Sequence, residues 1–116
     1  MVGHSLASLE ALPLAELVRR ASTPPLAEEA ESALASEVAA GDPEAREQLV
    51  AGHLRDVVDV AIAHRGGGVA MDVLVRRGLA GLVAAAREYD PLRHPPFPAF
   101  ARRHIRREVR AVLLSH

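Results

Sequence analysis

The 116-residue chain contains no cysteine, no tryptophan and no lysine, and aromatic residues make up only 3% of it. The absence of cysteine excludes disulfides and thiolate metal sites, and redox chemistry therefore says nothing about the compartment. With so few aromatic residues, a core must consist mainly of Ala, Val and Leu, a composition that favours close-packed helices over a sheet. The length fits one domain with a single modest core. We find no β pattern and no repeat, so the expected fold class is all-α.

Long apolar runs are also missing from the sequence. None approaches the roughly 20 residues that a helix needs to cross a bilayer. No N-terminal segment has the length and flanks of a signal peptide. We therefore expect no contact with a membrane and a cytoplasmic location.

Charge is distributed unevenly, although the net charge is only -1. Residues 1–59 carry 11 acidic and 4 basic side chains, whereas residues 60–116 carry 4 acidic and 10 basic ones, all of them arginine. This asymmetry predicts an anionic partner for the C-terminal half. The acidic half is sufficiently explained as a solvated charged surface.

Apolar spacing and helix breakers predict a bundle of four or five helices. Residues 1–25 are expected to form a short helix over 9–21, followed by a proline-containing linker. Residues 26–116 are expected to form the main helical domain. The predicted helices of that domain cover residues 26–40, 43–64, 72–88 and 98 to the C-terminus.

Glycines mark where these helices end, bend or approach one another. Gly41 is placed to cap the second predicted helix, and the Asp-Pro pair after it is typical of the N-cap and first turn of a third. Gly52 is placed to kink that third helix. Gly78 and Gly81 lie three residues apart inside the next one, where glycine is destabilising, and therefore indicate the close approach of another backbone.

The last predicted helix carries the clearest chemical signal. Its arginines gather on one side, with Phe100 and His104 beside them, and only Glu108 is available on this helix to neutralise them. Like charges at helical spacing destabilise a helix, and phosphate oxygens suit guanidinium groups, so an anionic partner would stabilise it. An exposed Phe100 could stack on an unpaired base. The expected core stripe is Phe97, Ala101, Ile105, Val109 and Val112, and the arginines are Arg103, Arg106, Arg107 and Arg110.

Two other interpretations of this helix stay open. Its arginines could pair with the acidic N-terminal half and simply be solvated. A basic amphipathic helix could also lie on lipid, although so small a core needs its apolar side. We favour nucleic acid over both.

No pattern predicts catalysis, a metal site or a cofactor. The six histidines form no H-E-x-x-H motif and no ligand spacing on one helix face, and no serine has the context of a nucleophile elbow. The glycines at 66–68 lack the Lys-Ser/Thr ending of a phosphate-binding loop. Asp56 and Asp59, one turn apart, are typical of a solvated face. We therefore expect a protein that is not an enzyme and holds no metal or other cofactor.

Short motifs follow one another in a fixed order along residues 26–114. Residues 41–50 read Gly-Asp-Pro-Glu-Ala-Arg-Glu-Gln-Leu-Val, and residues 78–82 read Gly-Leu-Ala-Gly-Leu. Between and after them come His53-Leu54-Arg55, Val57-Val58, Ala85, Tyr89-Asp90-Pro91-Leu92-Arg93, Phe97, Phe100-Ala101 and Ile105-Arg106. In order and spacing, these motifs resemble the second conserved region of sigma-70-family transcription initiation factors. The resemblance covers about three quarters of the chain.

The resemblance implies a helical domain that binds a coiled coil of the largest subunit of core RNA polymerase. It also implies that the last helix reads and melts the minus-ten promoter element, and that the protein is associated with the nucleoid. The implied polymerase-binding residues are Val73, Leu74, Arg76, Arg77, Leu79 and Val83. The implied DNA-binding residues are Arg93, Phe100, Arg103, His104, Arg106, Arg107 and Arg110.

The sequence departs from the family at these functional positions. The family's docking motif, Asp-Leu-x-Gln-Glu-Gly, is replaced by Val-Leu-Val-Arg-Arg-Gly at residues 73–78. The resemblance implies a basic partner surface, so Arg77 would repel it where the family has an attractive glutamate. Arg103 and His104 stand where primary sigma factors have the aromatic pair that wedges the duplex open. The sequence ends at His116, where we expect the C-terminal promoter-reading domain to be missing.

Three functional hypotheses follow. The first is a sigma-like initiation or regulatory factor that contacts core RNA polymerase and promoter DNA. The second is a protein-interaction module on a sigma scaffold, an antagonist or a dimerising regulator that no longer melts promoters. The third is a nonspecific nucleic-acid binder that uses only the arginine side of the last helix.

Overall fold

The structure, a computed structural model, describes residues 9–115, which contain six complete helices and no strand. The all-α fold class is confirmed, and the described residues hold six helices where four or five were predicted. They are α2 (Leu14–Ala21), α3 (Glu28–Ala39), α4 (Pro43–Ala51), α5 (Leu54–Ala63), α6 (Met71–Glu88) and α7 (Phe97–Ser115).

The additional helix arises because the predicted helix over 43–64 is broken, not merely kinked. α4 ends at Ala51 and α5 begins at Leu54, with Gly52 and His53 between them. Leu26 packs directly over the break, and a Cβ at Gly52 would lie 2.6 Å from the Leu26 Cδ1 atom. Glycine therefore has two roles here, since it weakens the helix and makes room for a neighbour.

The N-terminal helix is also shorter than predicted. A single helix over 9–21 was expected, but α2 begins at Leu14 and Pro13 is its N-cap residue. Leu9 and Glu10 belong to a separate helical turn. A proline disfavours helical dihedrals at the residue before it, so the chain turns at this point. Residues 1–8 of the predicted N-terminal segment lie outside the described part of the chain.

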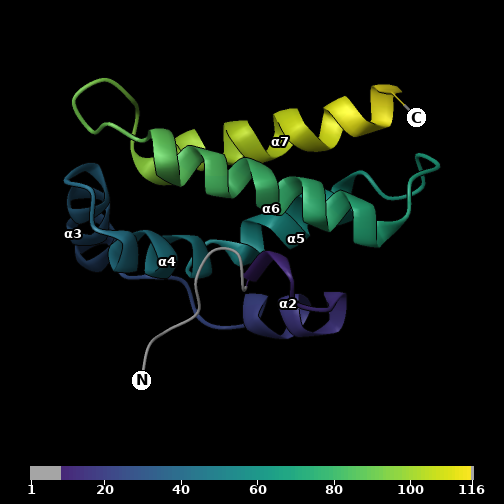
Figure 1. Cartoon of the computed structure of the whole chain (residues 1–116). Coiled ribbons are helices and arrows are strands. Elements are labelled where there is room, and N and C mark those ends of the chain that lie inside the picture. The colour runs from purple at the N-terminus through teal and green to yellow at the C-terminus, as the bar shows by residue number, and fades with distance from the viewer. Residues whose placement is uncertain (1–8, 116) are drawn as a thin grey trace.

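α6 is the central helix of the bundle, and it packs against α7, α5 and α4. α6 and α7 run antiparallel and side by side, α5 lies under α6, and α3 lies at the end of the molecule next to α4 (Figure 1). Because α6 has neighbours on three sides, half of its residues are buried. Its fully buried side chains include Leu74, Leu79 and Leu82.

The turn between α3 and α4 forms as the local signals predicted. Gly41 has φ 95°, its N–H donates to the Val38 carbonyl, and the Asp42 N–H donates to the Glu37 carbonyl. These two bonds are the Schellman pattern that ends a helix. The Asp42 carboxylate then accepts from the backbone N–H groups of Glu44 and Ala45, at 3.0 and 3.3 Å. The C-cap and the N-cap are both confirmed.

The two glycines of α6 lie where other elements approach it most closely. A Cβ at Gly81 would lie 2.6 Å from the backbone oxygen of His104 on α7. A Cβ at Gly78 would lie 3.0 Å from the Val57 side chain of α5 and 3.4 Å from that of Ile105. The predicted close approach of another backbone is therefore confirmed at Gly81.

Within residues 9–115, no helix is both long enough and apolar enough to cross a membrane.

Replacing Gly81 by alanine tests the close approach of α6 and α7. Alanine is the better helix former by about 1 kcal/mol, yet its Cβ would press on the α7 backbone. We expect Gly81→Ala to lower the free energy of unfolding by about 1–3 kcal/mol, measured by urea denaturation followed by far-ultraviolet circular dichroism. Arg87→Ala, at an exposed position of the same helix, should change it by less than about 0.5 kcal/mol. A stabilised Gly81→Ala variant would contradict this geometry.

Candidate nucleic-acid interface

α7 presents a continuous row of arginines to solvent. We call Arg103, Arg106, Arg107 and Arg110 the arginine face; all four are exposed. They occupy two turns of one helix, and Arg103 and Arg110 are separated by about 10 Å along its axis. The opposite side of α7 is buried at Ala101, Ile105 and Val109, and Val112 is partly buried. The predicted division of this helix into an apolar and a basic side is confirmed.

The arginine face has no carboxylate partner among the described residues. Glu108, the acidic residue of α7 expected to neutralise it, instead accepts from Arg77 of α6 at 3.2 Å. Of the arginines on α7, Arg102 alone forms an ion pair, with Asp56 of α5 at 3.6 Å. The interpretation in which the acidic N-terminal half neutralises this helix is therefore wrong for the arginine face.

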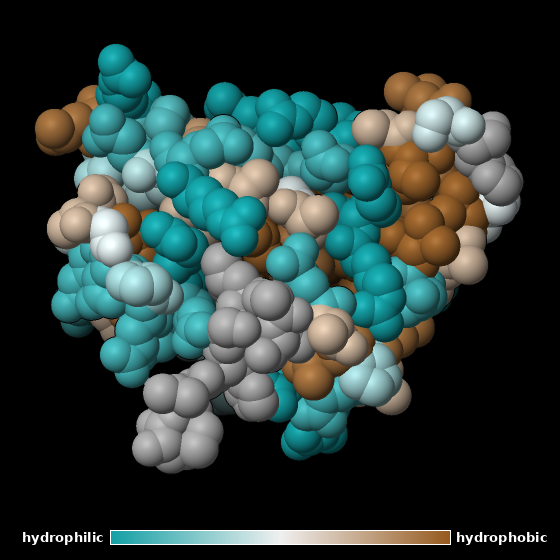
Figure 2. Space-filling view, viewed as in Figure 1, coloured by the Kyte–Doolittle hydropathy of each residue, from teal (hydrophilic) through white to brown (hydrophobic). Residues whose placement is uncertain are grey.

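The arginine side chains border an open depression of about 640 Å³ along α7. Figure 2 shows hydrophilic side chains gathered along the upper edge of the molecule, over the position of α7 in Figure 1. Apolar side chains lie at the two ends of this strip, with the larger group at its right-hand end. The lining residues are Ala99, Arg102, Arg103, Arg106, Arg107, Arg110, Ala111 and Leu114.

Phe100 and His104 do not belong to this exposed surface, and their prediction as exposed neighbours of the arginines is wrong. Each retains only 5% of its accessible surface. They lie three and seven residues after Phe97, which places them on the same side of α7 as the core positions. The apolar stripe of α7 is therefore wider than the spacing of Ile105 and Val109 alone indicated.

Phe100 belongs to a cluster of aromatic side chains at the junction of α6 and α7. It stacks on the His94 ring at 4.2 Å and lies 5.4 Å from the Tyr89 ring and 4.5 Å from the His104 ring, between centroids. His104 donates from Nδ1 to the Phe100 carbonyl at 3.0 Å. Among the described residues, Phe97, Phe100 and Tyr89 are all buried. No phenylalanine or tyrosine ring among the described residues is therefore available to stack on an unpaired base.

Arg93 is exposed on the connection between α6 and α7, and its only ion pair with a described residue is a long one to Asp90, at 3.9 Å. It does not line the depression bordered by the arginine face. Arg102, which sequence reasoning did not assign to DNA, does line it. The helical spacing already indicated that Arg102 lies near the arginine face, because it is one residue before Arg103 and four before Arg106 on the same helix.

The predicted polymerase-binding residues divide into two groups. Leu74, Leu79 and Val83 are at most 2% exposed, because α6 is surrounded by other helices, so their assignment to an accessible docking surface is wrong. Val73 is 39% exposed. Arg76 and Arg77 also reach the surface, but both are engaged within the chain.

Arg76 holds the start of α6 to the N-terminal segment. Its Nε donates to Asp72 at 3.0 Å, and its Nη1 donates to the backbone oxygen of Glu10 at 3.0 Å. Arg77 joins α6 to α7 through Glu108. The two arginines that depart from the family's docking motif thus make intramolecular contacts in this fold.

Asp56 and Asp59 differ in environment, although both were expected on a solvated face. Asp59 is exposed. The Asp56 side chain is only 22% exposed and contacts both His53 and Arg102. No group of three His, Asp or Glu side chains within residues 9–115 is arranged to hold a metal ion.

The fold and the arginine face define the class of protein: a small all-helical domain with a basic, unneutralised helix surface. This class includes many domains that bind nucleic-acid backbones. The particular family follows from comparison with curated proteins.

The chain is 32% identical over 82 residues to RNA polymerase sigma factor RpoS of Coxiella burnetii, a match that covers 71% of this chain and 23% of that protein. It is 30% identical over 86 residues to the RNA polymerase sigma-E factor of Clostridium acetobutylicum, covering 74% and 37%. It is 38% identical over 68 residues to the RNA polymerase sigma-C factor of Myxococcus xanthus, covering 59% and 23%. This chain is a diverged relative of the sigma-70 family, as the sequence motifs predicted.

The relationship is limited in extent. The matches span between 23% and 37% of the length of these three relatives. No model of a known protein family matches the chain.

Truncation of Phe100 distinguishes a buried from a base-stacking role. We expect Phe100→Ala to lower the free energy of unfolding by about 3–5 kcal/mol, because it leaves a cavity beside Tyr89 and His94. Arg103→Ala should change it by less than about 0.5 kcal/mol. Thermal or urea denaturation measures both. Unchanged stability in Phe100→Ala, with weaker binding of single-stranded DNA, would restore the exposed interpretation.

Proposed function

We propose that this chain acts in transcription as a sigma-70-like factor that contacts core RNA polymerase and binds DNA through the arginine face. The observation that carries the proposal is the row of four exposed arginines on α7 that have no carboxylate partner in the described chain. The similarity to sigma factors supports the same conclusion from an independent direction. The proposal assigns the chain no catalytic activity, and it places the protein in the cytoplasm with the nucleoid.

Electrostatics favours an anionic polymer as the ligand of the arginine face. Arg103, Arg106, Arg107 and Arg110 repel one another at i,i+3 and i,i+4 spacing, which destabilises the free helix. Phosphate groups would remove that repulsion, and each guanidinium can donate two parallel hydrogen bonds to one phosphate. Binding would release condensed counterions, so affinity would depend strongly on salt.

The mode of binding that the side chains support is contact with the phosphate backbone. Base reading requires side chains that reach base edges, whereas melting requires aromatic wedges or stacking platforms. The rings of Phe97, Phe100 and Tyr89 are all buried. This favours a factor that holds duplex DNA without melting it. Such a factor combines the sigma-like contact with polymerase and DNA of the first hypothesis with the loss of promoter melting of the second.

The polymerase contact is supported by the names of the relatives, which are RNA polymerase sigma factors. On this chain, the accessible part of the predicted docking surface is Val73, Arg76 and Arg77. A basic surface at this position would meet a basic partner surface with repulsion. We therefore propose weak polymerase docking, and a homodimer or another regulatory protein stays the alternative partner.

A salt titration of DNA binding tests the arginine face. Fluorescence anisotropy with a short duplex should show log affinity falling linearly with log salt. We expect the double variant Arg107→Ala/Arg110→Ala to reduce the slope by about 2, close to 0.9 for each lost phosphate contact. The duplex should bind regardless of its sequence.

The matched control for this experiment is Arg55→Ala/Arg87→Ala, which makes the same change in net charge at exposed positions of α5 and α6. Its slope should equal that of the unaltered chain. Undetectable binding at low salt, or equal slopes in both double variants, would refute the phosphate contact.

Polymerase docking is tested by restoring the family's residues. Because Arg77 contacts Glu108, a glutamate at position 77 would be repelled by Glu108, and the test therefore uses a Glu108→Gln background. In that background, Arg76→Gln/Arg77→Glu should bind core RNA polymerase about tenfold or more tightly than Glu108→Gln alone. Co-elution at increasing salt, followed by a titration, measures the difference, and Glu108→Gln alone is the control. If neither protein co-elutes at low salt, the polymerase contact is refuted, while the DNA titration stands as a separate result.

A further inference from the structure

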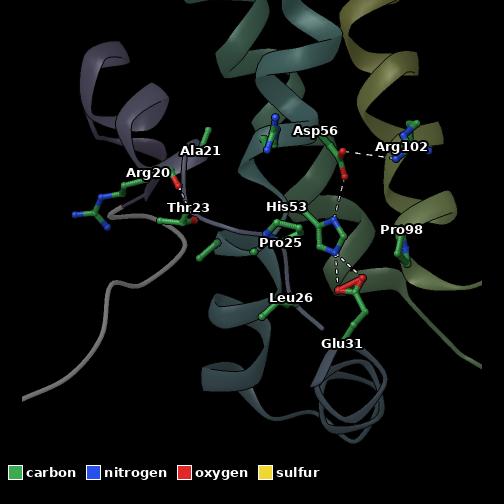
Figure 3. A pocket seen from close by; sticks show the side chains of 13 residues that line it. Arg20, Ala21, Thr23, Pro25, Leu26, Glu31, His53, Asp56, Pro98 and Arg102 are labelled. Carbon is green, nitrogen blue, oxygen red and sulfur yellow. Dashed lines mark hydrogen bonds and ion pairs between the residues drawn. The ribbon is translucent and has the colours of Figure 1, made fainter. Parts of the chain in front are cut away.

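His53 lies at the break between α4 and α5 with both of its ring nitrogens facing carboxylates. It is 8% exposed. Its Nδ1 contacts Asp56 Oδ2 at 3.0 Å, and its Nε2 contacts the two Glu31 oxygens at 2.6 and 2.8 Å. Figure 3 shows the ring between these two side chains, with Asp56 also directed at Arg102. One side chain therefore links α3, α5 and, through Asp56, α7.

The number of ring protons decides whether both contacts are attractive. A neutral imidazole has one N–H, so one of its nitrogens would present a lone pair to a carboxylate. The imidazolium has two N–H groups and donates to both Asp56 and Glu31. These are charge-assisted hydrogen bonds, which are shorter and stronger than neutral ones.

Titration of these groups agrees with the geometry. Burial disfavours the charged ring, but the hydrogen bonds to Asp56 and Glu31 and the negative charges of these two carboxylates together outweigh burial and raise the pKa of His53 above its ordinary value. The hydrogen bond from His53 lowers the pKa of Asp56 against the opposing effect of burial, with a smaller contribution from Arg102. The Asp56 carboxylate is therefore ionised throughout the range in which His53 titrates.

Other charged groups lie around the same site. Arg20 of α2, Arg55 of α5 and Arg102 of α7 line the cavity of about 250 Å³ into which His53 opens. Burial, together with the Glu31 carboxylate, raises the pKa of Tyr89, so this phenol stays neutral while His53 titrates. The edge-to-face contact of His53 with Phe97, at 5.2 Å between centroids, shields the ring on the side of α7.

α3 has few other attachments to the bundle. Its buried residues are two small ones, Ala35 and Val38, and it packs mainly on α4. Between α3 and the start of α7 is a cavity of about 470 Å³, lined by residues that include Glu31, Tyr89 and Phe97. On the side of this cavity, the contact from Glu31 to His53 joins α3 to the rest of the bundle.

We propose that His53 is a proton-dependent latch: the imidazolium donates to both Asp56 and Glu31 and holds α3 on the bundle, whereas the neutral ring, with a single N–H shared between the two carboxylates, weakens the contact with Glu31 and loosens α3. The latch does not depend on the arginine face or on its ligand, because the ion pair from Asp56 to Arg102 persists in either state of His53. Loosening of α3 would open the cavity beside Phe97. The protein would thus have a closed form at slightly acidic pH and a form with a loosened α3 at alkaline pH.

The pH window follows from the direction of the His53 shift. A histidine whose pKa is raised by folding contributes its full stabilisation below its unfolded pKa, about 6.5. That stabilisation is lost as the pH rises through the higher, folded pKa. Protection of α3 backbone amides from hydrogen exchange should therefore fall as the pH rises above 6.5, the ordinary value.

The experiment is amide hydrogen exchange of the full chain across this range, corrected for the intrinsic dependence on pH, together with an NMR titration of the His53 ring. Relative to protection in α6, protection in α3 should fall about tenfold for each unit by which the pKa of His53 in the folded protein exceeds that in the unfolded protein. The midpoint of this fall should coincide with the midpoint of the His53 ring titration. Different midpoints, or unchanged α3 protection, would overturn the latch.

Two variants complete the test. His53→Gln cannot titrate but can still donate to Glu31, so the dependence of α3 protection on pH should disappear while the fold is retained. His64→Gln removes the histidine at the other end of α5, whose Nδ1 contacts the Val60 carbonyl at 2.9 Å, and should leave the dependence unchanged. If His53→Gln does not fold, Glu31→Gln serves instead, and it should lower the midpoint of the His53 ring titration. A pH step that persists in either variant would refute the proposal.

Discussion

The arrangement of the bundle depends on how closely α6 and α7 approach each other at Gly81. The backbone oxygen of His104 occupies the space that a side chain at Gly81 would need. This contact sets the rotation of α7 about its axis, because the residues on either side of it, Phe100 and Ile105, must then face inward. The arginines, placed on the remaining side of the helix, face solvent as a consequence. The basic surface is therefore a result of backbone packing, and not only of the residues that form it.

Several charges that resemble functional residues in the sequence have structural contacts in the fold. Arg77 and Glu108 join α6 to α7, and Arg76 joins α6 to the backbone of Glu10. Such exposed pairs contribute little to stability individually, yet they occupy side chains that a partner would otherwise contact. The arginine face differs because nothing in the described chain neutralises it. This contrast supports the proposal that the arginine face, rather than the surface of Arg76 and Arg77, is the main binding surface.

The core is built largely from Ala, Val and Leu, and its polar contacts have correspondingly specific roles. Small side chains fill space well between helices that are close together, as at α6 and α7, but they hold a peripheral helix weakly. α3 contributes the buried Ala35 and Val38 and the partly buried Leu34 to the core, and its Glu31 contacts His53. A buried ionic contact of this kind adds little net stability when it is compared with apolar packing. In the proposed latch, the role of this contact is to respond to pH, because its strength depends on whether the His53 ring carries one proton or two.

Sequence alone determined most of the helices, the caps between α3 and α4, the close approach at Gly81 and the grouping of the arginines on one side of α7, because each is encoded within one or two helical turns. It also carried the ordered motifs that identify a relative of the sigma-70 family. Tertiary structure alone decided which side chains are covered. Phe100 is buried by Tyr89 and His94 from the preceding connection, and Glu31 meets His53 from 22 residues away. Periodicity reveals the sides of a helix, whereas burial depends on which neighbour lies against each side.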